Sequence, residues 1–223
     1  MSVLSQAQSM VDGSRATATV HPFFTRFSGQ KETEQIKRFA IEWYLAATGH
    51  KRAFPFLVAI TENDKTRQEL IEILRDEYGN GDPEKIHAKL LRRFVDQLGI
   101  TDQMLAFEKP ISEVKSFGET TLAMWRDGDP VTAFGYHYAL ELIAMGIHRA
   151  FASGLEGYGF SPESLEYFRY HSTAEEEHAK IAESAFTRYA TDEASRSKLF
   201  AGVKAGVQAL EQMWDGFDRH VFN

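Results

Sequence analysis

The chain has 223 residues, a formal net charge of −7 and no cysteine. Its length fits one large domain, and its 43% hydrophobic and 26% charged residues are ordinary for a soluble globular protein. The acidic balance and the lack of a basic run argue against a nucleic-acid partner, and the lack of cysteine excludes disulfides, Fe–S clusters, thiolate zinc sites and a cysteine nucleophile.

Residues 1–20 are polar and rich in Ser, Ala and Thr, which predicts a flexible or short-helix lead-in before one helical domain over residues 21–223. No apolar run approaches the roughly 20 residues of a membrane span. The N-terminus also lacks the apolar core of a signal peptide. We therefore expect no membrane partner and a cytoplasmic protein.

Hydrophobic residues recur at spacings of three and four along most of the chain, and period-two alternation is nowhere sustained. The pattern predicts an all-α single domain of seven or more helices. Gly49 is expected to end the first long helix, and the break at Gly79–Pro83 is the strongest in the chain. The expected helices start near Pro22 and then cover 31–48, 51–60, 64–78, 83–98, 101–107, 111–126, 131–158, 163–188 and 192–220.

The stretch Tyr170–Ala179 carries the clearest chemical pattern. On a helix, His171, Glu175 and His178 lie at i, i+4 and i+7, which places them on one stripe two turns long. Two imidazoles and a carboxylate on one stripe can bind a first-row transition metal. The competing interpretation is a solvated face, because Glu175 opens a run of three acids.

Glu141 lies in the least polar predicted helix, where a buried carboxylate is costly unless it is paired or bound to a metal. A salt bridge or a protonated side chain would also resolve that cost. His137 and His148 fall near the same side of the helix, as pocket groups or as histidines satisfied within the core.

Glu77 and His87 flank the Gly-rich break, which would let two helix ends approach each other, although a surface loop remains an alternative. With Glu141 and the His171 stripe, they make three imidazoles and three carboxylates from four helices. Carboxylate-bridged di-iron sites in helical bundles need about this set. Oxygen and imidazole donors without sulfur suit iron or manganese, and also zinc.

These residues together resemble the ligand pattern of the heme-oxygenase-like di-iron oxidases. The start His21-Pro22-Phe23 and the helix order look like the wider group that includes the TenA thiaminases and the pyrroloquinoline-quinone synthase PqqC. The resemblance covers roughly Pro22 to Arg188. The chain departs from many relatives at Glu175, where they have Asp, and this Glu should still bind a metal.

The resemblance implies a heme-oxygenase-like bundle of seven to eight helices without heme. It implies that O2 is a co-substrate and that a small-molecule substrate in an adjacent pocket undergoes N-oxygenation or oxidative C–C cleavage. An electron donor or reductase and a homodimer are also compatible with it. The two irons would be bound by Glu77, His87, Glu141, His171, Glu175 and His178.

Some members of the family, which resemble the chlamydial death-domain-associated protein, make p-aminobenzoate from their own Tyr and Lys side chains. Here the first helix offers Phe23 and Phe24 where that Tyr is expected, and Arg149, Phe151 and Ala152 follow Glu141 without a Lys. These positions argue against the self-consuming reaction.

Two other functions remain open. A metal-free relative could oxidise or bind a small heteroaromatic ligand, as PqqC does, whereas thiaminase chemistry of the TenA type is disfavoured because its Cys nucleophile is absent. A binding or interaction protein could use the ligand set as a structural site or a metal store. Six aromatic residues are candidates for a pocket or for plain core: Phe39, Trp43, Phe117, Trp125, Phe134 and Tyr138.

Overall fold

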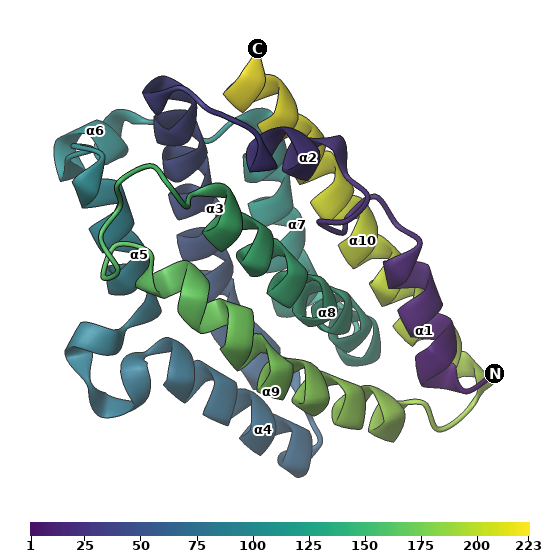
Figure 1. Cartoon of the computed structure of the whole chain (residues 1–223). Helices are drawn as coiled ribbons and strands as arrows, with labels where there is room; N and C mark the ends of the chain where they lie inside the picture. The colour runs from purple at the N-terminus through teal and green to yellow at the C-terminus, as the bar shows by residue number, and fades with distance from the viewer.

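The computed structural model describes residues 1–223, except for the side chains of Ala174 and Glu175. The described chain is all-α, as predicted, and it contains more helices than the seven to eight expected (Figure 1). The additional helices are short, for example the two near the N-terminus. The helices are α1 (Val3–Asp12), α2 (Pro22–Ser28), α3 (Thr33–Ile60), α4 (Asp64–Glu77), α5 (His87–Gln97), α6 (Asp102–Phe107), α7 (Ser112–Asp127), α8 (Pro130–Gly154), α9 (Glu166–Tyr189) and α10 (Glu193–Phe222).

Helix α3 corrects the expected break after residue 48, because one helix runs through Gly49 and contains Pro55. Its buried face continues from Trp43 past the glycine to Phe54 and Leu57. Burial of that face against the rest of the bundle outweighs the local cost of the glycine and the proline. The longer helix carries residues after position 49 into the same interior as the residues before it.

The turn between α4 and α5 is built from two short 3₁₀ segments, Gly79–Gly81 and Pro83–Lys85. The predicted helix start at Pro83 is therefore wrong, and α5 begins at His87. Gly79 has a φ of 80°, and a Cβ there would lie 2.8 Å from the Ile86 backbone nitrogen, so the turn needs glycine at this position. The turn places the last residue of α4 near the first residue of α5.

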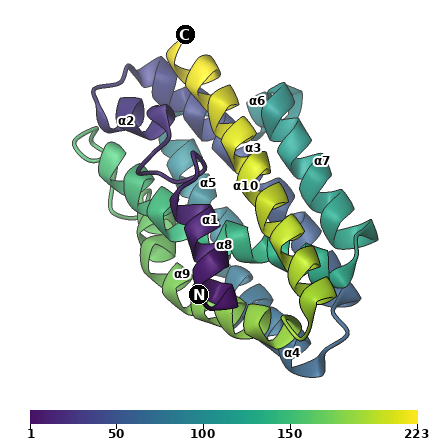
Figure 2. The ribbon, with the colours of Figure 1, turned by 90° about the vertical axis from the view of Figure 1, so that its right-hand side faces the viewer.

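Helix α8 forms the centre of the bundle and packs most extensively against α9 and α10, as the two views agree (Figures 1 and 2). Close approach of α8 and α10 depends on glycines in both helices. A Cβ at Gly135 would collide with the Leu199 carbonyl oxygen, and one at Gly202 would collide with that of Thr132. Among the described residues, no helix combines the length and apolar character needed to cross a bilayer.

Substituting Gly135 with Ala should destabilise the protein by about 1–3 kcal/mol, because α8 and α10 would have to separate. The matched control is Gly146→Ala in the same helix, where a Cβ meets nothing within 4 Å. That change should stabilise the protein by about 0.5–1 kcal/mol through helix propensity. Urea unfolding of the two variants checks the prediction, and equal effects would contradict it.

Glu42, on α3, is buried and accepts the Ile111 backbone N–H at 3.2 Å. Burial raises the pKa of this carboxyl to about 7, above its usual 4.5. The folded state therefore holds a proton that the unfolded state releases, and Glu42 costs stability as the pH rises from about 4.5 to 7. Relative to the wild type, Glu42→Gln should gain up to about 3 kcal/mol as the pH rises through this range, and its advantage should not change with pH below it, as measured by urea unfolding across pH.

Candidate metal centre

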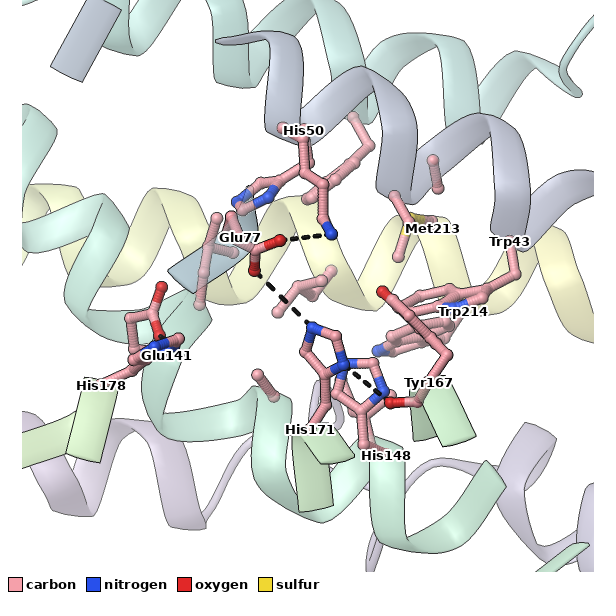
Figure 3. Close-up of a pocket in the computed structure, with 18 residues that line it drawn as sticks. Trp43, His50, Glu77, Glu141, His148, Tyr167, His171, His178, Met213 and Trp214 are labelled. Atoms are coloured by element: carbon pink, nitrogen blue, oxygen red, sulfur yellow. Dashed lines mark hydrogen bonds and ion pairs between the residues drawn. The ribbon is translucent and has the colours of Figure 1, made fainter. Parts of the chain in front are cut away.

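Three predicted ligands, Glu77, His87 and His171, meet where α4, α5 and α9 converge. Figure 3 shows two of them, Glu77 and His171. Glu77 Oε2 lies 2.9 Å from His87 Nδ1, and Glu77 Oε1 lies 3.6 Å from His171 Nε2. The three side chains each offer one ligand atom, and these atoms lie within 4.8 Å of one another. With metal–ligand distances of roughly 2 Å, one ion could contact all three after small adjustments.

A second group of donors adjoins the first. His178 Nδ1 lies 3.8 Å from Glu141 Oε2, and His178 Nε2 lies 3.5 Å from Asp76 Oδ2. The same Asp76 oxygen lies 3.7 Å from His87 Nε2, so His87 stands between the two groups. The structure thus brings five of the six predicted ligands into one continuous cluster. The side chain of the sixth, Glu175, lies outside the described residues.

The buried donor atoms of the cluster fit the ligand set of a divalent metal ion. Asp76 Oδ2, Glu77 Oε2 and His87 Nδ1 are buried and have no aligned hydrogen bond among the described residues. Buried polar atoms normally have well-aligned hydrogen bonds, so three such atoms close together fit the donor set of a shared metal ion. Carboxylate oxygens and imidazole nitrogens without sulfur are the donors that suit iron or manganese.

The protonation states also suit metal binding. Burial alone would raise the pKa of Glu77, but the Lys51 ammonium and the nearby imidazoles of His171 and His87 hold that pKa well below its usual value. Burial opposes ionisation of Asp76 as well, yet the nearby His178 imidazole and the hydrogen bond from the Tyr170 hydroxyl bring its pKa to about 2. Burial lowers the pKa of His87. The two carboxylates are ionised and His87 is neutral, which are the forms that bind metals.

Neighbouring groups orient the histidine on α9. His171 Nδ1 lies 2.7 Å from the Tyr167 carbonyl oxygen, so it donates there and leaves Nε2 directed at Glu77. His148 stacks on His171 with 4.6 Å between ring centroids. His137 Nδ1 lies 3.4 Å from Glu141 Oε1. The hydrogen bond to Tyr167 fixes the tautomer of His171, and the packing contacts limit the directions that the His171 and Glu141 side chains can take.

Asp76 is held in a similar way from the protein surface. The Tyr170 hydroxyl donates to Asp76 Oδ1 at 2.6 Å, and the Asn80 side-chain amide donates to the same oxygen at 2.7 Å. Both bonds engage Oδ1 and leave Oδ2 facing His87 and His178. Asp76 is therefore positioned to bind a metal or to orient the two histidines.

A cavity of about 100 Å³ lies beside the cluster, between α3, α8, α9 and α10. Glu77, Glu141, His171 and His178 reach its wall, so the candidate ligands face the space that a substrate would occupy (Figure 3). Most of the other walls are apolar or aromatic, which suits a small organic molecule. They include Trp43, Phe117, Leu140, Ile147, Leu210, Met213 and Trp214.

The six aromatic candidates divide between this cavity and the core. Trp43 and Phe117 line the cavity, and Trp43 stacks on Trp214 with 5.9 Å between ring centroids. The other four are buried in the core without lining it: Phe39, Trp125, Phe134 and Tyr138.

Sequence reasoning missed two polar residues at the centre. Lys51 contacts Glu77 and lines the cavity, and Asp76 adds a carboxylate to the cluster. Lys51 lies four residues after Ala47 on the apolar face of α3, a signal that was hidden by the expected helix end at Gly49. Asp76 follows from no motif, because its direction depends on how α4 meets α5 and α9.

A family model described as iron-containing redox enzyme matches residues 37–211. Curated relatives named 4-aminobenzoate synthase are similar over most of their length. The protein from Chlamydia trachomatis is 32% identical over 205 residues, covering 88% of this chain and 84% of the relative. That from Chlamydia muridarum is 29% identical over 208 residues, covering 88% and 83%.

Solved structures share the fold at lower identity. A CADD-like protein of unknown function from Nostoc punctiforme superposes with a TM-score of 0.83 at 17% identity, covering 99% of this chain and 97% of the other. A TenA homologue from Pseudomonas syringae has a TM-score of 0.77 at 11% identity, covering 96% and 90%. These likenesses identify the heme-oxygenase-like fold.

If the cluster binds a divalent metal, excess Mn(II) should raise the melting temperature by about 5–10 °C, because the ion binds the folded state only. Glu77→Gln should lose most of that rise, since it removes a charged ligand from the centre. Glu72→Gln, at an exposed position of the same helix, should keep it. Differential scanning calorimetry with and without Mn(II) decides, and an unchanged shift in Glu77→Gln would count against this centre.

Proposed function

This chain belongs to the family of iron-containing redox enzymes, and from that premise we propose that it is a non-heme di-iron oxidase that uses O2 to oxidise a small organic substrate. The observation that carries the proposal is the cluster of carboxylates and imidazoles in the wall of an apolar cavity. We propose N-oxygenation or oxidative C–C cleavage as the reaction, with an external electron donor or reductase as partner.

In this proposal, Glu77, His87 and His171 hold one iron. Glu141, Glu175 and His178 hold the second, with Asp76 as an additional carboxylate. When bound, iron would supply the redox chemistry with O2. The carboxylates neutralise the charge of the metal, and the imidazoles fix its position.

The remaining residues bind and shield the substrate. The Trp43 and Trp214 rings, with Leu210 and Met213, provide an apolar surface that excludes water from the reaction. The Tyr167 carbonyl keeps the His171 ring in one orientation, and the stacked His148 limits its rotation. The protein thereby holds the substrate next to the oxidising centre and removes competing solvent.

A second candidate is formation of 4-aminobenzoate, the activity in the names of the relatives at 29–32% identity. In favour of it, the cavity wall contains a lysine and a tyrosine, Lys51 and Tyr167, with 5.5 Å from the ammonium to the ring centroid. Against a reaction like that of the self-consuming relatives, Phe23 and Phe24 of α2 are buried and have no hydroxyl at the place where the consumed Tyr is expected. Intact-protein mass spectrometry after turnover distinguishes the two, because self-consumption changes the mass of the chain and oxidation of an external substrate does not.

Protein purified from iron-supplemented cells should contain about two irons per chain. His171→Ala and His178→Ala should each lose at least about half of that iron, because each removes a ligand from one of the two groups. His220→Ala, in α10 and away from the cluster, is the matched control and should retain it. Iron is measured by inductively coupled plasma mass spectrometry.

Oxygen consumption by the reduced protein then separates an oxidase from a metal store. Consumption that depends on iron and falls in both ligand variants is expected. Full iron content without O2 consumption would favour the store, whereas activity that survives complete removal of iron would favour a metal-free oxidase of the PqqC type.

A further inference from the structure

Lys51 contacts the carboxylate at the centre of the first ligand group. Its ammonium pairs with Glu77 Oε2, the same oxygen that lies 2.9 Å from His87 Nδ1. Lys51 comes from α3, whereas the carboxylate and the imidazole come from α4 and α5. The oxygen that would bind a metal is thus shared with a positively charged group of the protein.

The pair is largely removed from solvent. The side chain of Lys51 is 14% exposed and that of Glu77 is 16% exposed. The ammonium also lies over the Tyr167 ring, 5.5 Å from its centroid. Isolated charges are costly at such burial, so each of the two groups compensates the other in the metal-free protein.

A bound metal would change that balance. An ion held by Glu77, His87 and His171 would bring at least two positive charges to the carboxylate that Lys51 now neutralises. Like charges a few ångströms apart repel strongly in a site with little water, because the effective dielectric constant is low. The ammonium and the metal therefore compete for one carboxylate oxygen.

We propose that Lys51 is an internal cation that holds Glu77 ready in the metal-free protein and is displaced from it when a metal binds. This role of Lys51 rests on the proposed metal centre, and it adds a group of the protein that sets the affinity of that centre for metal. The ammonium lowers the affinity for metal, because binding has to break the Lys51–Glu77 pair. Lys51 already lines the cavity, so the displaced side chain stays next to the substrate space.

A purely structural salt bridge predicts the opposite result. If Lys51 served to position Glu77 for the metal, its removal would misplace a ligand and weaken binding. If it competes with the metal, its removal leaves the buried carboxylate without its ammonium partner, and a metal ion then binds that carboxylate more favourably. The direction of the change in metal affinity separates the two roles.

The test is titration of the full-length, metal-free protein with Mn(II), with the free ion counted by electron paramagnetic resonance. Lys51→Met keeps most of the side-chain length and removes the charge, and it should lower the Kd of the more tightly bound Mn(II) ion by at least about tenfold. Lys51→Arg keeps the charge and should show no such gain. Lys65→Met, at an exposed position of α4, is the matched control and should bind as the wild type does.

Thermal unfolding gives a second readout. Metal-free Lys51→Met should melt below the wild type, and the rise on adding Mn(II) should be larger in the variant. If Lys51→Met does not fold without metal, Lys51→Gln is titrated and judged by the same direction of change. An unchanged or higher Kd in the uncharged variant overturns the role of Lys51. Absence of Mn(II) binding by the wild type instead overturns the proposed metal centre.

Discussion

The cost of burying carboxylates determines the arrangement around the centre. Glu77 and Glu141 occupy the wall of an apolar cavity, where an ionised carboxylate needs a positive or hydrogen-bonding partner. Histidines from α5, α8 and α9 surround them, and Lys51 adds an ammonium from α3. The side chains of one helix therefore stabilise the charged side chains of another. The same carboxylates and imidazoles make the cluster suitable for metal ions.

The bundle supports this cluster through two glycine-dependent features. Gly79 permits the reversal between α4 and α5 that brings Glu77 to His87. Gly135 and Gly202 permit close contact between α8 and α10, which form two sides of the cavity. None of these glycines contributes a side chain to the centre. They fix the positions of the helices whose side chains form the cluster. Substitution of these glycines would therefore change the geometry of the cluster by moving the helices.

Several expectations from the sequence are confirmed and several are wrong, for physical reasons. The all-α class follows from the spacing of apolar residues, which is a local property. The expected end of a helix at Gly49 is wrong because burial of a continuous face outweighs a single glycine. That error hid Lys51, whose place on the face becomes evident only when the helix continues. The helix start at Pro83 is wrong because 3₁₀ turns precede His87, which brings this imidazole to the first position of α5.

The sequence by itself determined the chemistry of the donors and their sides of each helix. Without cysteine, any metal has to be held by oxygen and imidazole nitrogen, and the 3.6-residue period assigns His171 and His178 to one stripe of α9. Only the tertiary structure decided which stripes face one another, and that Asp76 and Lys51 join the predicted residues. The reason is that periodicity orients a side chain relative to its own helix, whereas distances between helices depend on how all their surfaces pack together.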